Sequence, residues 1–294
     1  MMELQTWSFL PAAQAAMFGG GNPALTLLNP ISADLDTMRP SLLPNLLDAA
    51  KRNVARGFKN MALFEVGLQF HDITPDGQKT VASGIRIGTV ENNNYDGGLF
   101  TQKPRNIDAM DAKEDAVAIL QALGVNKLEI STANLPNYYH PNRCGAFVLG
   151  KNILGYFGEI HPKIATAFDL ESKVSAFEIF LDAIPVARNK GTNKPPLKLS
   201  DYQAVERDFA FIVDEKITAA TIEKEINKAE KNLITSVEIF DVYSGKGVDT
   251  GKKSVAVKVT MQSFERTFSE TDITAVSNAI IAAAEKTFGG VLRQ

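Results

Sequence analysis

The segment Ser254-Val-Ala-Val-Lys-Val-Thr-Met-Gln262 carries the clearest secondary-structure pattern in the C-terminal part of the chain. Valine or methionine occupies every second position, and the positions between them carry Ser, Ala, Lys, Thr and Gln. Because successive side chains of a β-strand point to opposite faces of its sheet, this alternation predicts a strand with one buried face and one polar face. We therefore expect a sheet with one surface open to solvent.

The segments around this strand predict a βαββαβ order, with the turn Ser244–Lys252 joining the two middle strands. The other elements are a strand around Phe209–Val213, a helix around Ile222–Ala229, a strand at Val237–Tyr243, a helix from about Ser269 to Gly289, and an edge strand in Val291–Arg293. This order is the ferredoxin-like arrangement. Its two helices cover one face of the sheet and leave the other face open.

The length of 294 residues predicts two domains. The stretch Arg188–Leu197 is polar, contains a glycine and a Pro-Pro pair, and has the composition of a linker. We therefore expect one domain at residues 1–190 and a second at residues 191–294.

The first of these domains shows less periodicity. Its expected elements are a helix from Pro44 to Gly57, strands at Ala62–Phe70, Val81–Thr89 and Gly145–Gly150, and a helix at Asp111–Leu123. In the first of these strands, four apolar residues share one face: Phe64, Val66, Leu68 and Phe70. Strands and helices without a regular βαβ alternation predict an α+β class with an antiparallel sheet.

Composition argues against several classes of protein. No run of 18 apolar residues occurs and the N-terminus has no signal-peptide pattern, so we expect no membrane association. The single cysteine, Cys144, precludes an internal disulfide and fits a cytoplasmic location. Three isolated histidines give no zinc-site spacing. Because the formal charge is −3, any nucleic-acid binding must be local.

Several stretches, in order along nearly the whole chain, resemble one family, the β subunits of bacterial phenylalanyl-tRNA synthetases. They are Leu28–Ser32, Met38–Pro44, Leu63–Gly67, Tyr139–Arg143 and Gly155–Pro162 in the first domain, and Arg207–Phe211, Phe240–Gly245 and Lys253–Ala256 in the second. The resemblance implies a class II synthetase-like antiparallel sheet module followed by a ferredoxin-fold anticodon-binding domain. It also implies that the chain corresponds to the last third of a longer subunit.

The resemblance implies partners as well. The first domain is expected to scaffold the catalytic α subunit in an α2β2 assembly, and the second to bind the anticodon of tRNA(Phe). The whole enzyme is expected to use ATP and Mg²⁺ as a phenylalanine–tRNA ligase. Because the acidic magnesium-associated site of the family lies upstream, no metal ligand and no cofactor are expected in this chain.

Catalysis by the chain itself is not expected. Class II synthetases need an arginine on a central strand and a second in a late glycine-rich motif, because adenylate formation builds charge on the phosphates. Here Phe64-Glu-Val-Gly67 offers an acid, and Ser175–Asp182 contains neither the glycine run nor an arginine. We therefore expect the chain to be inactive alone, with no catalytic residues.

A freestanding enzyme on a synthetase-like fold is the alternative, with Glu65, Glu159 and His161 as its candidate residues. None of these has a partner at catalytic spacing, which favours hydrogen-bonding roles for the two acids and a turn role for His161 before Pro162. Cys144 beside Arg143 has the sequence context of an activated thiol, but an isolated cysteine is more often a packed apolar residue.

The resemblance places the anticodon contacts at Asp241, Tyr243 and Ser254. Stacking on a base is expected for Tyr243, and hydrogen bonds to a base edge for Asp241 and Ser254. The competing interpretations are a packed aromatic and a turn-capping aspartate. A third possibility for the whole chain is a structural module whose ferredoxin-like domain binds protein.

Basic residues beside these positions are candidates for phosphate contacts. Between residues 246 and 258, four lysines against one aspartate give a net charge of +3. Lys252, Lys253 and Lys258 are therefore included in the predicted tRNA-binding set, although such turns are often merely solvated. Arg207, followed by Asp208 at the start of the first strand, is included too, with an internal ion pair that holds the strand end as the alternative.

Overall fold

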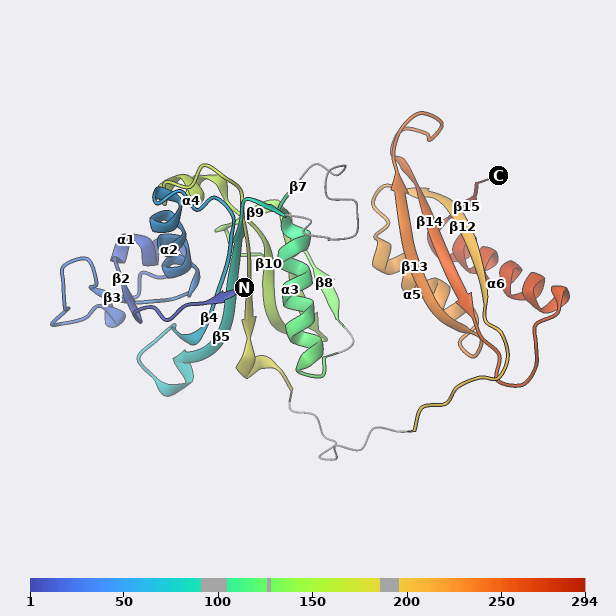
Figure 1. Ribbon diagram of the computed structural model, residues 1–294, viewed down its shortest axis with the longest axis horizontal. Helices are drawn as coiled ribbons and strands as arrows, with labels where there is room; N and C mark the ends of the chain where they lie inside the picture. The colour runs from blue at the N-terminus through green and yellow to red at the C-terminus, as the bar shows by residue number, and fades with distance from the viewer. Residues whose placement is uncertain (91–104, 126–127, 186–195, 294) are drawn as a thin grey trace. The chain divides into compact units, whose positions relative to one another are not determined.

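The chain divides into two units, residues 1–190 and residues 191–294, which are described separately below as the N-terminal and the C-terminal unit. The computed structural model describes residues 1–90, 105–125, 128–185 and 196–293. The predicted linker Arg188–Leu197 lies, up to residue 195, outside the described residues. Figure 1 labels the elements.

A seven-stranded sheet forms the centre of the N-terminal unit, in the order β1-β4-β5-β11-β10-β9-β8. Every pairing in it is antiparallel except the parallel pair β1–β4. Its strands are β1 (Met2–Glu3), β4 (Met61–Phe70), β5 (Gln78–Ile87), β8 (Glu129–Ser131), β9 (Tyr139–Leu149), β10 (Asn152–Ile160) and β11 (Val174–Phe180). Two two-stranded antiparallel sheets complete the described strands of this unit: β2 (Phe9–Leu10) with β3 (Thr37–Met38), and β6 (Thr89–Val90) with β7 (Arg105–Asn106).

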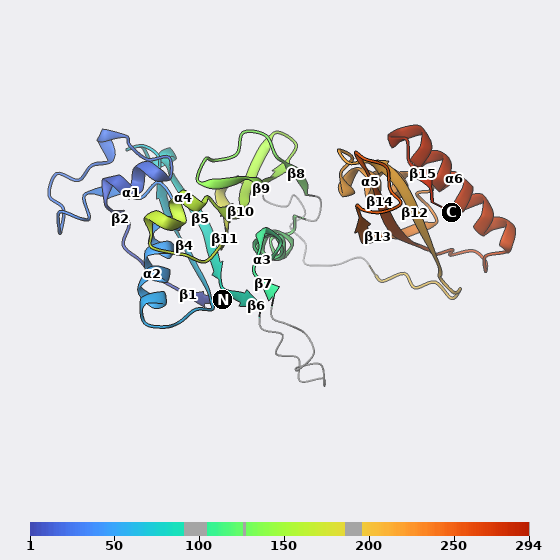
Figure 2. The same cartoon turned by 90° about the horizontal axis from the view of Figure 1, so that it is seen from above.

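Helices lie on both faces of this sheet, and Figures 1 and 2 show α2 and α3 on opposite sides of it. The helix α2 (Leu43–Ala55) buries Leu46, Leu47 and Ala50 against the face that carries Ile85, together with the short α1 (Ala12–Met17) and α4 (Pro162–Ala167). The helix α3 (Ala109–Ala122) buries Ala116 and Leu120 against Phe177 on the other face. The predicted α+β class with an antiparallel sheet is confirmed.

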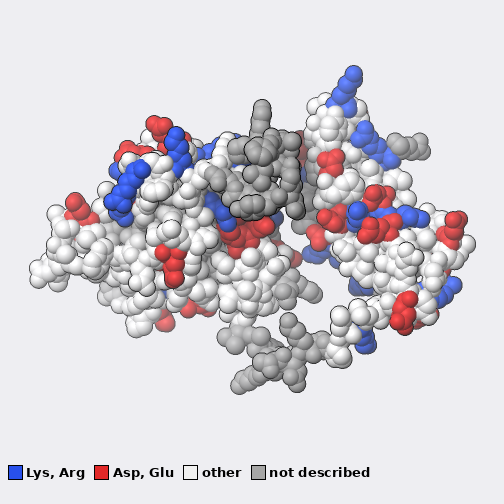
Figure 3. Space-filling view, in the orientation of Figure 1, with Lys and Arg blue, Asp and Glu red and all other residues white. Residues whose placement is uncertain are grey.

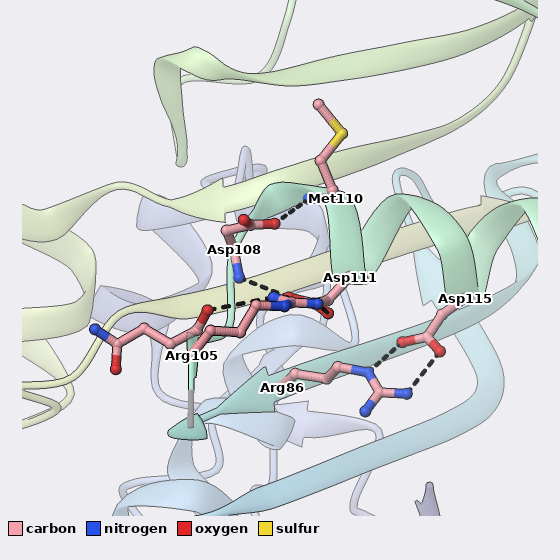
Figure 4. Close-up of polar contacts among 7 residues, drawn as sticks. Arg86, Arg105, Asp108, Met110, Asp111 and Asp115 are labelled. Carbon is pink, nitrogen blue, oxygen red and sulfur yellow. Dashed lines mark hydrogen bonds and ion pairs between the residues drawn. The ribbon is translucent and has the colours of Figure 1, made fainter. Parts of the chain in front are cut away.

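Ion pairs fix the first turns of α3, as Figure 4 shows. Arg86 of β5 donates to both carboxylate oxygens of Asp115, at 2.6 and 2.8 Å. Arg105 does the same to Asp111, at 2.8 and 2.6 Å, and lowers the pKa of the Asp111 carboxyl. Asp108 accepts from the backbone N–H of Met110 and so caps the helix. This end of α3 is therefore held by structural contacts.

The strand β4 carries its side chains in an unexpected orientation. Its four apolar residues share one face, as predicted, but Val66 and Leu68 are exposed there. Glu65 and Gln69 on the opposite face are buried. The reason is that the sheet face covered by α2 contains a network of polar side chains, and these form hydrogen bonds with both Glu65 and Gln69. The predicted strand Gly145–Gly150 belongs to the longer β9.

The C-terminal unit has the βαββαβ order that its sequence predicts. Its sheet has the strand order β13-β14-β12-β15, and every pairing is antiparallel. The elements are β12 (Val205–Asp214), α5 (Ala219–Ala229), β13 (Ile234–Tyr243), β14 (Lys252–Met261), α6 (Glu270–Phe288) and β15 (Val291–Leu292). This is the ferredoxin-like fold, with β14 and β12 at its centre.

Both helices of this unit lie on one side of the sheet, as Figures 1 and 2 show. Ile226 of α5 and Ile280 of α6 are fully buried against Phe211 and Val257 of the central strands. Ser269 and Asp272 form the capping box that begins α6, and Gly289, with a φ of 62°, ends it. Among the described residues of this unit, no helix covers the opposite surface of the sheet. We call this surface the open face.

Candidate nucleic-acid interface

Strand register places Asp241, Tyr243 and Ser254 together on the open face. Asp241 pairs with Ala256, and Tyr243 pairs with Ser254. The neighbours of Ser254 and Ala256 along β14, Val255 and Val257, lie in the core, so the two paired positions must face the other way. The three positions predicted to contact a base are therefore neighbours on one surface.

Tyr243 lies at the rim of this face, against the β13–β14 hairpin. Its hydroxyl donates to the carbonyl oxygen of Lys246 at 3.3 Å, and 41% of the residue is exposed. A Cβ atom on Gly245 would lie 2.7 Å from that hydroxyl, so the turn needs glycine for the ring to approach it. The hairpin thus fixes the orientation of the ring while much of its surface stays accessible.

The other two residues differ in their accessibility. Asp241 is exposed. Ser254 is only 5% exposed, because its register partners Tyr243 and Ile212 flank it on both sides. A ligand that reaches the Ser254 hydroxyl must therefore come in close contact with the Tyr243 ring.

The predicted basic residues do not all lie on this face. Lys258 does, and it forms an ion pair with Glu206 at 3.7 Å. Lys252 lies at the hairpin and forms an ion pair with Asp249 at 3.4 Å. Register places Lys253 opposite Val213, on the side that the helices cover.

Arg207 also lies on the helix side of β12. It pairs with Val259, whose side chain is in the core. Its guanidinium donates to the backbone oxygen of Glu206 at 3.1 Å. The open face thus contains Asp241, Tyr243, Ser254 and Lys258, with Lys252 at its end, whereas Arg207 and Lys253 belong to its margins.

The open face is acidic. Register and alternation place five carboxylates on it, against Lys252 and Lys258, for a net charge of −3: Glu206, Asp208, Asp214, Glu238 and Asp241. Figure 3 shows red and blue side chains mixed on this surface, with blue at the tip of the β13–β14 hairpin. Such a field disfavours phosphates over the middle of the sheet and admits them at the hairpin.

In the N-terminal unit, the candidate acid Glu65 is bound internally. Its carboxylate accepts from the Arg39 guanidinium at 2.9 Å and from the Thr6 hydroxyl at 2.6 Å. Arg39 also donates to the backbone oxygen of Leu68 at 2.8 Å. The side chains of the ion pair are only 3% and 5% exposed. Glu65 therefore lies mid-strand as a structural group.

A second buried acid, Glu178 of β11, was not found from the sequence. Its carboxyl accepts from four donors, and burial raises the pKa of that carboxyl. The donors are Ser41 at 2.6 Å, Gln69 at 3.1 Å, Tyr138 at 2.8 Å and Tyr139 at 3.4 Å. One signal for this site is present in the sequence, an acidic residue within the mostly apolar segment Val174–Phe180.

The remaining candidates of a freestanding enzyme have structural partners too. Glu159 forms ion pairs with Arg143 at 2.8 Å and Lys173 at 3.7 Å. His161 caps α4, where its Nδ1 accepts from the backbone N–H two residues later. The Cys144 thiol donates to a backbone oxygen at 2.9 Å, and burial raises its pKa, which disfavours the reactive thiolate.

Among the described residues, no three His, Cys, Asp or Glu side chains form a group that is able to hold a metal ion. No helix among the same residues is long and apolar enough to cross a membrane.

Comparison with known proteins assigns both units. Residues 1–181 match the phenylalanyl tRNA synthetase beta chain CLM domain, and residues 200–293 match the ferredoxin-fold anticodon binding domain. The chain is similar over its full length to the phenylalanine–tRNA ligase beta subunits of Paramagnetospirillum magneticum and Bartonella quintana, at 45% identity each. It covers 36% and 37% of those two proteins, so it spans little more than a third of their length.

Among solved structures, a pyrrolysyl-tRNA synthetase from Desulfitobacterium hafniense is similar at 13% identity and a TM-score of 0.44, over 62% of this chain and 60% of that one. That similarity is too low to assign a fold. The family models and the relatives, by contrast, account for both units in order. The chain belongs to the phenylalanyl-tRNA synthetase β-chain family.

Proposed function

We propose that this chain is a non-catalytic, tRNA-binding and subunit-scaffolding part of a phenylalanine–tRNA ligase β subunit. In this proposal the C-terminal unit binds the anticodon of tRNA(Phe), and the N-terminal unit supports the catalytic α subunit in an α2β2 enzyme of the cytoplasm. The observation that carries the proposal is the meeting of Asp241, Tyr243 and Ser254 on an open sheet face.

Each of these three side chains has a role that its chemistry suits. The exposed ring of Tyr243 offers a surface on which an unpaired base can stack. The Asp241 carboxylate accepts hydrogen bonds only, which suits the two adjacent donors on a guanine edge. The Ser254 hydroxyl both donates and accepts, and its recessed position suits a base already held by the ring.

The basic residues act at the margins of this face in the proposal. Lys252 at the hairpin contacts phosphate, with Lys253 and Arg207 on the helix side and Lys258 on the sheet as weaker contributors. Lys258 and Lys252 are already paired with acids, so a phosphate must compete with Glu206 and Asp249 for them. Affinity in isolation is therefore expected to be weak and strongly salt-dependent.

The polar contacts of the N-terminal unit support its non-catalytic role. A triphosphate needs cations, but Arg39 is committed to Glu65, and Glu178 occupies the same side of the sheet with all four of its donors. These residues do not fit ATP and Mg²⁺. In the proposal, ATP and Mg²⁺ are used by the whole enzyme, at its α subunit.

An apolar groove supports the scaffolding role. It has a volume of about 430 Å³ and lies between β4 and α3, with Val66 and Leu123 exposed on its walls. Phe177 and Ala82 also line it. Exposed apolar surface of this kind usually marks a protein contact, and the α subunit is the partner that the family provides.

One experiment tests both halves of this proposal. The chain is co-expressed with the α subunit of its relatives' enzyme, and co-purification is scored together with binding of tRNA(Phe) and of a tRNA with a changed anticodon. Tyr243→Ala should remove about 1–3 kcal/mol of binding free energy, whereas Tyr243→Phe should keep most of it, because the ring face supplies the stacking. If Tyr243→Ala leaves anticodon discrimination intact in a folded protein, the open face is not the recognition surface.

A further inference from the structure

The edge strand β13 contains a β-bulge at Phe240. Ile239 pairs with Val257, but Asp241 pairs with Ala256, so the register shifts by one residue between them. In a bulge, two successive residues stand opposite one residue of the neighbouring strand. Phe240 and Asp241 therefore both lie opposite Ala256, at the edge of the open face.

This bulge decides which side chains reach the open face. Val237 and Ile239 pack on the core side, so strict alternation would also turn positions 241 and 243 toward the core. A shift of one residue reverses the faces of all following residues. The bulge is thus the reason that Asp241 and Tyr243 lie on the open face, and Phe240 is the residue at which the reversal occurs.

Phe240 itself is a large apolar side chain that the fold does not use. It is 53% exposed and lies outside the core that Ile239 joins. Val242 is equally exposed, but it pairs with Val255 of the core and so belongs to the helix side. Along β13, Asp241 thus lies between two exposed aromatic residues, Phe240 at the bulge and Tyr243 on the open face.

We propose that Phe240 is a second base-stacking residue, which receives an unpaired base beside the one on Tyr243. This inference rests on the proposed function. Three residues along a strand span about 10 Å, whereas bases stacked on one another are about 3.4 Å apart. The two bases must therefore be separated from each other, as in single-stranded RNA whose bases lie on protein aromatic rings.

The electrostatics of the face favour bases over other ligands at this position. Glu238 and Asp241 lie on either side of Phe240 in the sequence, and both carboxylates are exposed. The negative charge of these carboxylates repels phosphate, whereas their oxygens accept hydrogen bonds from the N–H groups of base edges. The nucleotide backbone then runs outside the strand, toward the basic hairpin, while its bases point onto β13.

The test uses the whole 294-residue chain and a hairpin RNA that carries the anticodon loop of tRNA(Phe). The fluorescent base 2-aminopurine, which is quenched when it stacks, replaces one anticodon base at a time. We expect quenching at two positions with the unaltered protein. Phe240→Ala should abolish one of these signals and reduce affinity about 5- to 150-fold, the range for the loss of one stacked base. Tyr243→Ala should abolish the other signal.

Matched variants separate stacking from other effects. Val242→Ala changes an equally exposed side chain of the same strand on the other face, and should alter neither signal. Phe240→Trp should retain the quenching that Phe240→Ala loses, and Phe240→Leu, which keeps an apolar side chain without a ring, should not. Circular dichroism confirms that each variant is folded.

The outcomes distinguish this inference from the proposed function. If Phe240→Ala or Phe240→Leu binds like the unaltered chain while Tyr243→Ala is impaired, Phe240 is not a stacking residue and the proposed function stands. If the unaltered chain quenches neither base and does not distinguish the hairpin from one with a changed anticodon, both are overturned.

Discussion

Replacing Glu65 by leucine tests whether the buried ion pair between Glu65 and Arg39 stabilises the N-terminal unit. Among the described residues, Glu65 is the one carboxylate that pairs with Arg39, whose side chain is 3% exposed. The substitution leaves the Leu68 and Trp7 carbonyl oxygens and the Thr6 hydroxyl as the partners of the guanidinium. Breaking a buried pair by removing one partner costs about 3–5 kcal/mol. Domains are stable by only about 5–15 kcal/mol, so the change is a large part of the total.

The expected shift is large enough to measure directly. For a unit of this size, each kcal/mol moves the melting temperature by about 2–4 °C, which gives a decrease of about 6–20 °C. Urea denaturation followed by the fluorescence of Trp7, the only tryptophan in the chain, reports on this unit alone. Asp169→Asn is the control: it weakens the exposed ion pair Lys51–Asp169 and should leave the midpoint unchanged.

A double variant tests the physical reason. Arg39→Met with Glu65→Leu removes both charges, and replacing a whole buried pair by apolar side chains is often neutral or stabilising. The double variant should therefore recover more than half of the stability that Glu65→Leu loses. A loss below about 1 kcal/mol for Glu65→Leu, or no recovery in the double variant, would show that the buried pair does not hold this unit together.

Four further outcomes follow from the structure. Burial raises the pKa of Glu178 above its value in the unfolded chain. Glu178 therefore contributes its full stabilisation below about pH 4.3, and this contribution is lost as the pH rises through the pKa of the folded state. In urea titrations, the difference in unfolding free energy between the unaltered chain and Glu178→Gln should shrink over that pH interval. Lys252→Ala should weaken all RNAs alike and flatten the dependence of the binding constant on salt, whereas unchanged salt dependence would remove Lys252 from the phosphate contacts. Limited proteolysis should cleave first within Arg188–Leu197 and leave a stable piece of about 100 residues, and a first cut within Val237–Gln262 would contradict the domain boundary. The purified chain should show no phenylalanine-dependent exchange of pyrophosphate into ATP; exchange that Glu65→Gln abolishes would contradict its non-catalytic role.

The C-terminal unit was predictable because its signals are local. Alternation over residues 254–262 defines a strand and its buried face, and the run from Ser269 to Asp272 defines the start of a helix through contacts within one turn. These patterns arise from residues that are close together in the sequence, so they can be recognised from the sequence alone. The βαββαβ order follows from them without knowledge of long-range contacts.

The polar network of the N-terminal unit was not predictable for the opposite reason. Ser41 and Glu178 are 137 positions apart, and Gln69 and Glu178 are 109 apart. A one-strand pattern shows that Phe64 and Val66 share a face but does not show which face is buried, since that depends on partners contributed by other segments. The bulge at Phe240 is hidden in the same way, because only pairing with β14 reveals the change of register.

The two units differ in what their carboxylates are free to do. A carboxylate has about four lone-pair positions, and it contributes to recognition only if some of them stay accessible. Glu178 fills its positions with four internal donors, and Glu65 is closed off by Arg39 and Thr6. Asp241 is instead exposed on the edge strand β13, with the exposed aromatic residues Phe240 and Tyr243 near it in the sequence. Acids of the first kind stabilise a fold, and acids of the second kind are available to a ligand, which is why we propose recognition for the C-terminal unit and a structural role for the N-terminal one.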